Sequence, residues 1–315
     1  AVLAGGSAYS AGADARLVYS VRIGVVDPRE VVVVLVDASS GEILREEALT
    51  SSALDRYLLS CHDSSGADCD HSEIAEYRVV GYEPVARDPF GLLPTASWWG
   101  TSSTVWSLLE LTWDYYFLAH GRDSWNAEGG TFAAFADADT LMPADDPLNA
   151  AWCWGCVPQR VAFGSSTACP EVILHESTHG VTADEGWLSD EPPLRTRELG
   201  EATSDAMAQL ALAELSPGED DWVQGGEIGC PMEYRDLADP GGLCERSTGI
   251  HHQNPSSWSD YSVGESKPHF NSTIVSQLAY LLGRPPGAGA VERNGIPVRP
   301  LGPGAAADLW YDVIL

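Results

Sequence analysis

The sequence is poor in basic residues. Its 315 residues include 17 lysines and arginines against 46 aspartates and glutamates, which gives a formal net charge of −29 at pH 7. A surface this acidic repels phosphate backbones and anionic lipid head groups. The composition therefore argues against nucleic acid and an anionic membrane as partners. It favours solubility and an extracellular or salty setting, but it does not specify a substrate.

Long apolar runs are also missing. The longest run, residues 31–36, is far shorter than the roughly 20 residues that a membrane-spanning helix needs. We therefore expect no membrane span. No secretory signal peptide is visible, yet the first residue is Ala1 and not methionine, so we expect the chain to be processed or cut from a longer one. Its length suffices to bury a large core in two lobes or more.

The seven cysteines are few but clustered, at positions 61 and 69, at 153, 156 and 169, and at 230 and 244. Short separations of this kind suit disulfides in a secreted protein. We expect the first pair and the last pair each to form one, and Cys169 to be bonded to Cys153 or Cys156. Because seven is an odd number, one cysteine is left over, and it stays a free thiol or forms a disulfide outside this chain. A zinc knuckle on Cys153 and Cys156 is the alternative, although no second cysteine pair follows at finger spacing.

The segment that most clearly suggests catalysis is residues 169–182, which contains the pattern H-E-x-x-H. His175 and His179 are four residues apart and Glu176 lies between them. On a helix, residues four apart share a face, so both imidazoles can bind one metal ion while Glu176 transfers a proton. Residues 165–167 offer N-cap side chains and Pro170 suits a first turn, which predicts a helix here. The alternative is a pair of surface or hydrogen-bonded core histidines.

A second acidic cluster supports the metal site. Glu201 and Asp205 are again four residues apart, within a helical pattern at residues 197–215. Two histidines and one carboxylate form a catalytic zinc set with the fourth position open, and Asp205 can reach the back nitrogen of a ligand histidine. Glu198 is a rival third ligand. We choose Glu201 because only Glu201 is followed one turn later by Asp205.

At these residues the chain resembles the thermolysin-like neutral metalloproteases, which are bacterial secreted zinc enzymes. Residues 175–182 are similar to their zinc helix, and residues 200–205 are similar to the helix that carries their third ligand. The resemblance implies an α+β fold with two lobes, a reduced β-rich N-terminal lobe and a mainly α-helical C-terminal lobe. The zinc helix is expected to lie between them.

The resemblance also assigns roles. It implies Zn²⁺ held by His175, His179 and Glu201, with Glu176 as the general base and Asp205 orienting a ligand. Residues 149–152 are similar to a strand that edges the family's active-site cleft. By this resemblance, Asn149 and Ala150 are expected to hold the substrate main chain. Such an edge pairs with an extended peptide. The alternative is an internal strand.

Further matches follow along the chain in the family's order. Arg235, within residues 232–240, is expected to bond the substrate carbonyl beyond the scissile bond, and His269 to act as a second catalytic histidine. Val172 and Tyr234 border the expected side-chain pocket and favour an apolar residue. A surface arginine and a surface or capping histidine are the alternatives.

The sequence suggests three segments. Residues 1–52, with strand-like runs at 17–23, 31–36 and 42–49, resemble the end of a pro-region; an ordinary three-stranded part of the main domain is the alternative. Residues 53–184 are expected to form the N-terminal lobe, with a helix at 104–120 that Gly121 ends. Residues 185–315 are expected to form the C-terminal lobe, with a helix at 272–282, and to be truncated.

The chain also departs from the family. Its calcium site would keep Glu171 and Asp221, but Leu212, Val223 and Gly226 stand where carboxylates are expected, so Ca²⁺ lacks the ligands for tight binding. Asp190 stands near the place of a tyrosine that assists the second histidine. Gly264 replaces the acid that usually precedes that histidine, with Glu265 beside it.

The expected function is a secreted, extracellular zinc endopeptidase made as a zymogen. Its partners would be peptide or protein substrates and its own pro-region, and neither nucleic acid nor a membrane. One alternative is a weak or inactive relative that binds peptides or proteins, which the departures above would favour. A second is an aminopeptidase of another zinc family, which would need a free substrate N-terminus.

Overall fold

The computed structural model describes most of the chain. The described residues are 2–9, 16–24, 30–37, 39–50, 55–60, 75–80, 99–136, 150–153, 159–164, 167–186, 194–215, 222–224, 235–241, 244–245, 251–252, 254–262, 268–293 and 296–314.

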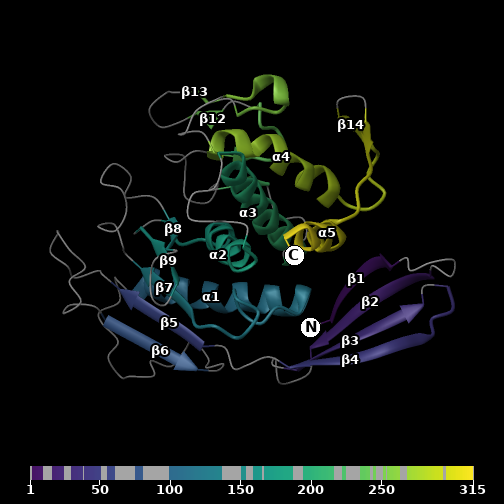
Figure 1. Cartoon of the computed structure of the whole chain (residues 1–315), viewed down its shortest axis with the longest axis horizontal. Helices are drawn as coiled ribbons and strands as arrows, with labels where there is room; N and C mark the ends of the chain where they lie inside the picture. The colour runs from purple at the N-terminus through teal and green to yellow at the C-terminus, as the bar shows by residue number, and fades with distance from the viewer. Residues whose placement is uncertain are drawn as a thin grey trace.

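An antiparallel sheet of four strands opens the chain (Figure 1). Its strands pair in chain order and are β1 (Val2–Tyr9), β2 (Arg16–Gly24), β3 (Glu30–Asp37) and β4 (Ile43–Thr50). The three predicted strands are confirmed. β1 was not predicted, because its small residues give no alternating apolar pattern. Asp37 forms the turn before β4 by accepting hydrogen bonds from the backbone N–H groups of Ser39 and Ser40, and Gly41 adopts a φ of 73°.

A second sheet of five strands has the order β6-β5-β7-β9-β8. Its strands are β5 (Asp55–Ser60), β6 (Ala75–Val80), β7 (Phe132–Ala136), β8 (Ala150–Cys153) and β9 (Arg160–Phe163). β7 is parallel to β5 and to β9, whereas β6 and β8 pair antiparallel at the two edges. The predicted cleft-edge strand is therefore an edge strand within the described part of this sheet.

Helix α1 (Trp99–His120) covers this sheet. Its buried side chains include Leu109, Trp113 and Phe117, and the last two rings stack with centroids 4.9 Å apart. Gly121 ends the helix as predicted, with a φ of 69° and its N–H donating to the carbonyl of Phe117. The helix begins five residues earlier than its apolar pattern indicated.

Four helices build the C-terminal part: α2 (Pro170–Asp184), α3 (Leu194–Leu215), α4 (Pro268–Gly283) and α5 (Pro303–Ile314). α3 contacts the other three. Its buried face carries small residues that allow this close packing, namely Ala202, Ala206, Ala208 and Ala211. The chain is α+β with a helical C-terminal part, as predicted.

Short elements complete the described chain. They are β10 (Val223–Gln224), β11 (Arg235–Asp236), β12 (Cys244–Glu245), β13 (His251–His252), the 3₁₀ turn Trp258–Asp260, β14 (Val291–Arg293) and β15 (Ile296–Val298). The strands pair as three two-stranded ribbons, β10 with β11, β12 with β13 and β14 with β15. None of the helices described here combines the length and apolar character that crossing a bilayer requires.

Helix α2 lies between two hydrophobic cores that the described residues form. Ile173 packs into the core that α1 forms with the five-stranded sheet, whereas the next residue, Leu174, and Val181 pack into the core shared with α3, α4 and α5. α2 is therefore held from both sides along its length. This double packing fixes the orientation of the polar residues that it carries.

The start of α2 differs from the prediction. The N-cap is Cys169, and no side chain caps the helix; Thr167 instead donates its hydroxyl to the carbonyl of Gly164. Pro170 stands in the first turn, where its missing N–H costs nothing and its fixed φ suits a helix, so the helix begins directly after Cys169. Thr167 lies two residues before that N-cap, and its hydroxyl is engaged by Gly164.

Cys169 corrects a second expectation. Its side chain is buried at the entrance to α2, and its sulfur is not in a disulfide, so the predicted bond to Cys153 or Cys156 is wrong. The physical reason is its position, because Cys169 is the N-cap residue of α2 and its side chain is buried there. The other two predicted pairs include cysteines outside the described residues.

Candidate active site

His175 and His179 lie one turn apart on α2 and face the same carboxylate. Nε2 of His175 is 3.2 Å from Oε2 of Glu201 on α3, and Nε2 of His179 is 3.5 Å from Oε1 of the same carboxylate. One ligand atom from each residue can be chosen so that all three lie within 4.8 Å of one another. Two imidazole nitrogens and one carboxylate oxygen at this spacing fit a single divalent ion that prefers mixed nitrogen and oxygen ligands, with room for a fourth ligand.

Glu198, the rival third ligand, takes no part in this group. Its carboxylate accepts hydrogen bonds from the Tyr261 hydroxyl and from Nδ2 of Asn271. Glu198 and Glu201 are three residues apart on α3 and share a face, but they contact different partners. The structure therefore places Glu201, and not Glu198, beside the two histidines.

Both histidines have a polar side chain behind the ring. Nδ1 of His175 is 2.9 Å from Oδ1 of Asp205, and Nδ1 of His179 is 3.2 Å from Oγ of Ser204. When Nε2 binds a metal ion, Nδ1 carries the proton and donates it, so these contacts select the tautomer and the ring orientation. Ser204 was not predicted. Its position three residues after Glu201, on the same helical face, is the signal that could have identified it.

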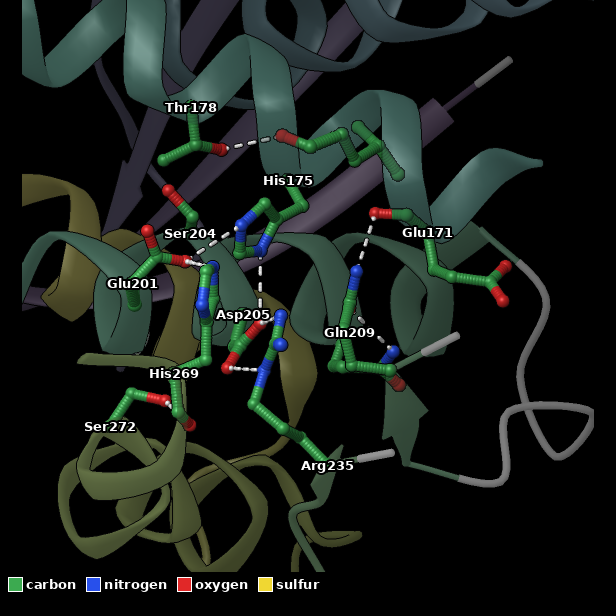
Figure 2. Close-up of polar contacts among 12 residues, drawn as sticks. Glu171, His175, Thr178, Glu201, Ser204, Asp205, Gln209, Arg235, His269 and Ser272 are labelled. Carbon is green, nitrogen blue, oxygen red and sulfur yellow. Dashed lines mark hydrogen bonds and ion pairs between the residues drawn. The ribbon is translucent and has the colours of Figure 1, made fainter. Parts of the chain in front are cut away.

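Arg235, on β11, anchors Asp205. Its Nε and Nη2 atoms donate to the two carboxylate oxygens at 2.7 and 2.8 Å, and both residues are buried. Figure 2 shows the row from Arg235 through Asp205 to His175. Arg235 is thus engaged by Asp205 in this structure, whereas the sequence assigned it to a substrate carbonyl. Two parallel charge-assisted hydrogen bonds hold the carboxylate firmly.

Glu176 is oriented by the edge strand β8. Its Oε2 accepts a hydrogen bond from the backbone N–H of Trp152 at 2.8 Å. One turn later on α2, Gly180 lies directly against the Trp152 ring, where a Cβ would approach an indole carbon to 2.5 Å. Glycine at this position therefore lets α2 approach β8 closely enough for the hydrogen bond to Glu176. Sequence reasoning did not identify this contact.

His269, in the first turn of α4, approaches the same carboxylate from the other side (Figure 2). Its Nε2 lies 3.0 Å from Oε2 of Glu201, and its side chain is 45% exposed. It is the most exposed of the three histidines around Glu201. His269 is therefore placed where a ligand entering from solvent could contact it.

The charges in the cluster are strongly coupled. Burial by itself would lower the pKa of His175, but its contacts with Asp205 and Glu201 outweigh burial and raise it to about 10. Burial opposes ionisation of Glu201, yet the charges of His269 and His179 hold its pKa well below the ordinary value. The negative charge of Glu201 raises the pKa of His269. Without a cation, protons supply the positive charge that these acids need.

Asp205 follows the same pattern. Burial would raise its pKa, but the charge of Arg235 and the contact with His175 lower it. The carboxylate is therefore ionised at neutral pH.

Buried polar contacts also fix the C-terminal end and the middle of α2. Arg122, after α1, donates to Glu185 at 2.6 Å and to Asp184 at 2.8 Å at the end of α2, and it contacts the Tyr311 hydroxyl of α5. It thereby compensates two acids at a helix C-terminus, where negative charge is unfavourable. Near the middle, the Thr178 and Tyr116 hydroxyls are hydrogen-bonded.

The structure describes two of the four residues that were predicted to bind substrate. Ala150 is buried at the start of β8, and Val172 is half-buried against the core of the sheet. Asn149 and Tyr234 lie outside the described residues. The pocket that the sequence predicted is therefore only partly visible.

Amides occupy the region expected for calcium. Gln209 donates to Gln224, and Gln224 donates to the backbone carbonyl of Glu171 at 3.2 Å. Figure 2 labels Gln209 and Glu171. Leu212 packs against the helical core. Within the described part of the chain, the one group of histidine and acidic side chains with metal-binding geometry is His175, His179 and Glu201.

Comparison with protein families gives one matching model. Residues 198–315 match the model described as thermolysin metallopeptidase, alpha-helical domain. The match contains Glu201, Asp205, Arg235 and His269, and it begins after the two histidines of α2.

Several curated proteins are similar over most of the chain. Over 228 residues it is 28% identical to a transglutaminase-activating metalloprotease of Streptomyces mobaraensis, covering 65% of this chain and 27% of that protein. An extracellular metalloprotease of Pectobacterium carotovorum subsp. carotovorum is 25% identical over 228 residues, with 67% and 59% covered. An extracellular elastase of Staphylococcus epidermidis is 24% identical over 181 residues, with 54% and 32% covered. The chain thus spans only 27–59% of the length of these relatives.

A solved structure shares the fold. The precursor of protealysin, a metalloproteinase from Serratia proteamaculans, aligns with a TM-score of 0.53 at 19% identity, covering 74% of this chain and 69% of that one. At this identity the likeness concerns the fold alone.

Proposed function

Because the chain belongs to the thermolysin-like metalloproteases, we propose that it is a secreted zinc-dependent endopeptidase that hydrolyses internal peptide bonds. The observation that carries the proposal is the convergence of His175, His179 and Glu201, with Glu176 on the same helix as the two histidines. An enzyme of this class needs a metal site with an open position and a base beside it.

The residues present fit zinc. His175, His179 and Glu201 would hold the ion, and Asp205 and Ser204 would keep the two rings oriented toward it. When bound, a zinc ion supplies a Lewis acid that polarises the peptide carbonyl and makes water nucleophilic near neutral pH.

Glu176 then serves as the proton carrier. It accepts a proton from the attacking water as the new C–O bond forms, and it returns that proton to the amine nitrogen as the C–N bond breaks. The Trp152 N–H occupies Oε2, so Oε1 is the oxygen assigned to the proton. A fixed carboxylate is an efficient base because little reorganisation is needed during the reaction.

His269 would stabilise the negative charge that develops on the carbonyl oxygen. It lies on the exposed side of the cluster, and the raised pKa of its imidazole favours the form that donates a proton or a hydrogen bond. Arg235 would act mainly through Asp205, because its Nε and Nη2 atoms both donate to that carboxylate. To contact the substrate as well, the Arg235 guanidinium would have to use donor N–H groups other than those that bind Asp205.

The substrate would bind as an extended strand along β8. Ala150 and Asn149 would bond its main chain, while Val172 and Tyr234 would favour an apolar residue after the scissile bond. The edge position of β8 supports this assignment. A set of peptides varied only at that residue would test the preference, and equal cleavage of charged and apolar variants would exclude it.

We assign residues 1–52 to the end of a pro-region. The similar fold of a solved precursor supports this, as does the separate sheet β1–β4. β1 contacts α5 and β2 contacts α1, whereas the candidate metal ligands lie on α2 and α3. These contacts favour a role in supporting α5. Cutting an inserted protease site after Thr50 should then lower the melting temperature without raising activity, and a large rise in activity would instead indicate inhibition.

The proposed function is tested with an internally quenched peptide blocked at both ends. Cleavage should stop when a chelator removes the metal and return when zinc is added. Because the ends are blocked, cleavage would also exclude an aminopeptidase. Cleavage that persists in chelator would refute the zinc mechanism, and the absence of cleavage by zinc-loaded protein would favour a binding role.

A further inference from the structure

Two carboxylates on one face of α3 reach the first turn of α4. Glu201 contacts His269, and Glu198, one turn earlier, contacts Asn271. Glu198 is not in the metal group, although it is a buried carboxylate on the same helix as Glu201. A buried carboxylate needs hydrogen-bond partners that offset the cost of its desolvation. The partners of Glu198 therefore indicate what this residue stabilises.

The contacts of Glu198 form a closed network. Nδ2 of Asn271 donates to Oε1 of Glu198 at 2.7 Å, and the Tyr261 hydroxyl donates to the same oxygen at 2.9 Å. Asn271 also donates to the carbonyl of Ser262 at 2.8 Å and accepts from its N–H at 3.1 Å. Both N–H groups of the Asn271 amide are therefore engaged and its oxygen accepts one hydrogen bond, so its orientation is defined by a donor on one side and acceptors on the other.

The same network immobilises the start of α4. Thr273 donates its hydroxyl to the carbonyl of Pro255 at 2.8 Å, which adds a second tie between α4 and residues 254–262. Asn271 is two residues after His269 in that first turn. Glu198 thus links the helix turn that carries Glu201 to the helix turn that carries His269.

We propose that Glu198 is a positioning residue that holds His269 in place over Glu201. This inference rests on the proposed function, because it gives His269 its role in peptide hydrolysis. The donors to Glu198 are neutral groups, so the network needs an acceptor oxygen and not a negative charge. A displacement of about 1 Å at a reacting group can reduce the rate about a hundredfold.

The variants follow from this geometry. Glu198→Ala removes the acceptor and should lower kcat/KM about tenfold to a hundredfold, with metal affinity unchanged. Glu198→Gln keeps Oε1 for Tyr261 and Asn271, so it should recover most of the activity. Asn271→Ala should behave as Glu198→Ala does, because it breaks the same link from the other side.

A double-mutant cycle with His269→Ala separates positioning from a general loss of stability. If Glu198 acts through His269, Glu198→Ala should cause little further loss of kcat/KM once His269 is absent. An equal loss in both backgrounds would overturn the proposal, as would a Glu198→Gln variant as inactive as Glu198→Ala. Loss of metal from Glu198→Ala would also overturn it, because Glu198 would then support the metal ligands.

The proposed function can fail separately. If the zinc-loaded wild-type chain cleaves no peptide, the side-chain NMR signals of His269 provide the second measurement. Glu198→Ala should shift and broaden those signals, whereas Glu198→Gln should leave them close to wild type. Unchanged signals in Glu198→Ala would overturn the positioning role even in an inactive protein.

Discussion

Nδ1 of His175 lies 2.9 Å from Oδ1 of Asp205, a buried carboxylate that is held in turn by two nitrogens of Arg235. The row runs from β11 through α3 to α2, so three elements determine the direction of one imidazole. In a metal site this arrangement fixes the tautomer and increases the basicity of the ligand.

Replacing Asp205 with asparagine should therefore weaken zinc binding. The amide keeps the shape of the side chain but removes the charge that faces His175 and Arg235, and loss of such an outer contact costs about ten- to a hundredfold in affinity. Competition with a chromophoric chelator measures the effect. Asp236→Asn is a matched control, because the Asp236 carboxylate accepts hydrogen bonds from the N–H groups of Ala238 and Asp239 and, within the described residues, contacts none of the metal ligands. Equal affinities in the two variants would contradict the prediction.

Ser204→Ala should reduce zinc affinity less than the change at Asp205, by about tenfold. A neutral hydroxyl orients His179 through a single contact, so its loss frees the ring without removing a charge. Ser177→Ala removes an equally buried hydroxyl from the metal helix, but that hydroxyl has no hydrogen-bond partner among the residues that the structure describes. Equilibrium dialysis should separate the two variants. Identical zinc affinities would show that Ser204 does not orient the ligand.

Zinc uptake should release protons at neutral pH. The pKa of His175 is raised to about 10, so its imidazole carries a proton at pH 7 that the metal must displace. Calorimetry in buffers of different ionisation enthalpy should therefore give binding heats that depend on the buffer. Heats that are the same in all buffers would mean that no proton leaves.

The same shift predicts how stability depends on pH in the metal-free protein. Its folded pKa of about 10 lies above the ordinary value of 6.5, so the stabilisation is complete below pH 6.5 and is lost as pH rises through 10. Asp205 acts in the opposite direction, because its pKa is lowered from 3.8 and its contribution is lost in acid. Thermal melts should therefore fall from pH 6.5 toward 10, and His175→Gln should flatten that decline.

Gly180→Ala should destabilise the fold and slow the reaction. The new methyl would approach the buried Trp152 ring to 2.5 Å and push β8 away from α2, which weakens the hydrogen bond to Glu176. Overpacking of this kind costs about 1–3 kcal/mol. We expect kcat/KM to fall while one zinc ion still binds.

Gly200→Ala is the control for that change. It makes the same substitution in a helix, at a position where a Cβ meets nothing within 4 Å. Alanine is the better helix former, so this variant should be neutral or more stable by up to about 1 kcal/mol. If Gly180→Ala were as stable and as active as Gly200→Ala, the contact with Trp152 would have no role in orienting the base.

The part of the site that sequence could predict is local. His175 and His179, and likewise Glu201 and Asp205, share helix faces because they are four residues apart, and helical spacing is visible in a single chain. The extent of α3 was also close to the prediction. What joins the two pairs is helix packing, which the spacing alone could not determine.

The contacts that were missed join distant parts of the chain. Trp152 and Glu176 meet only because β8 docks on α2, and Glu198 reaches Asn271 only because α4 crosses α3. Backbone donors such as the Trp152 N–H leave no mark in residue identity. The N-cap of α2 was missed for a local reason, since the helix begins at Pro170 and its N-cap is a cysteine, which is not among the preferred capping residues.

The central claim is that one divalent ion is bound by two imidazoles from α2 and one carboxylate from α3. X-ray absorption on the zinc-loaded chain, with zinc counted per protein, tests it most directly. One zinc ion per chain is predicted, with two nitrogen neighbours at about 2.0–2.1 Å and oxygen for the rest. Glu201→Ala should lose the ion, and Glu198→Ala should keep it. Zinc that remains fully bound in Glu201→Ala, or a shell containing sulfur, would contradict the account.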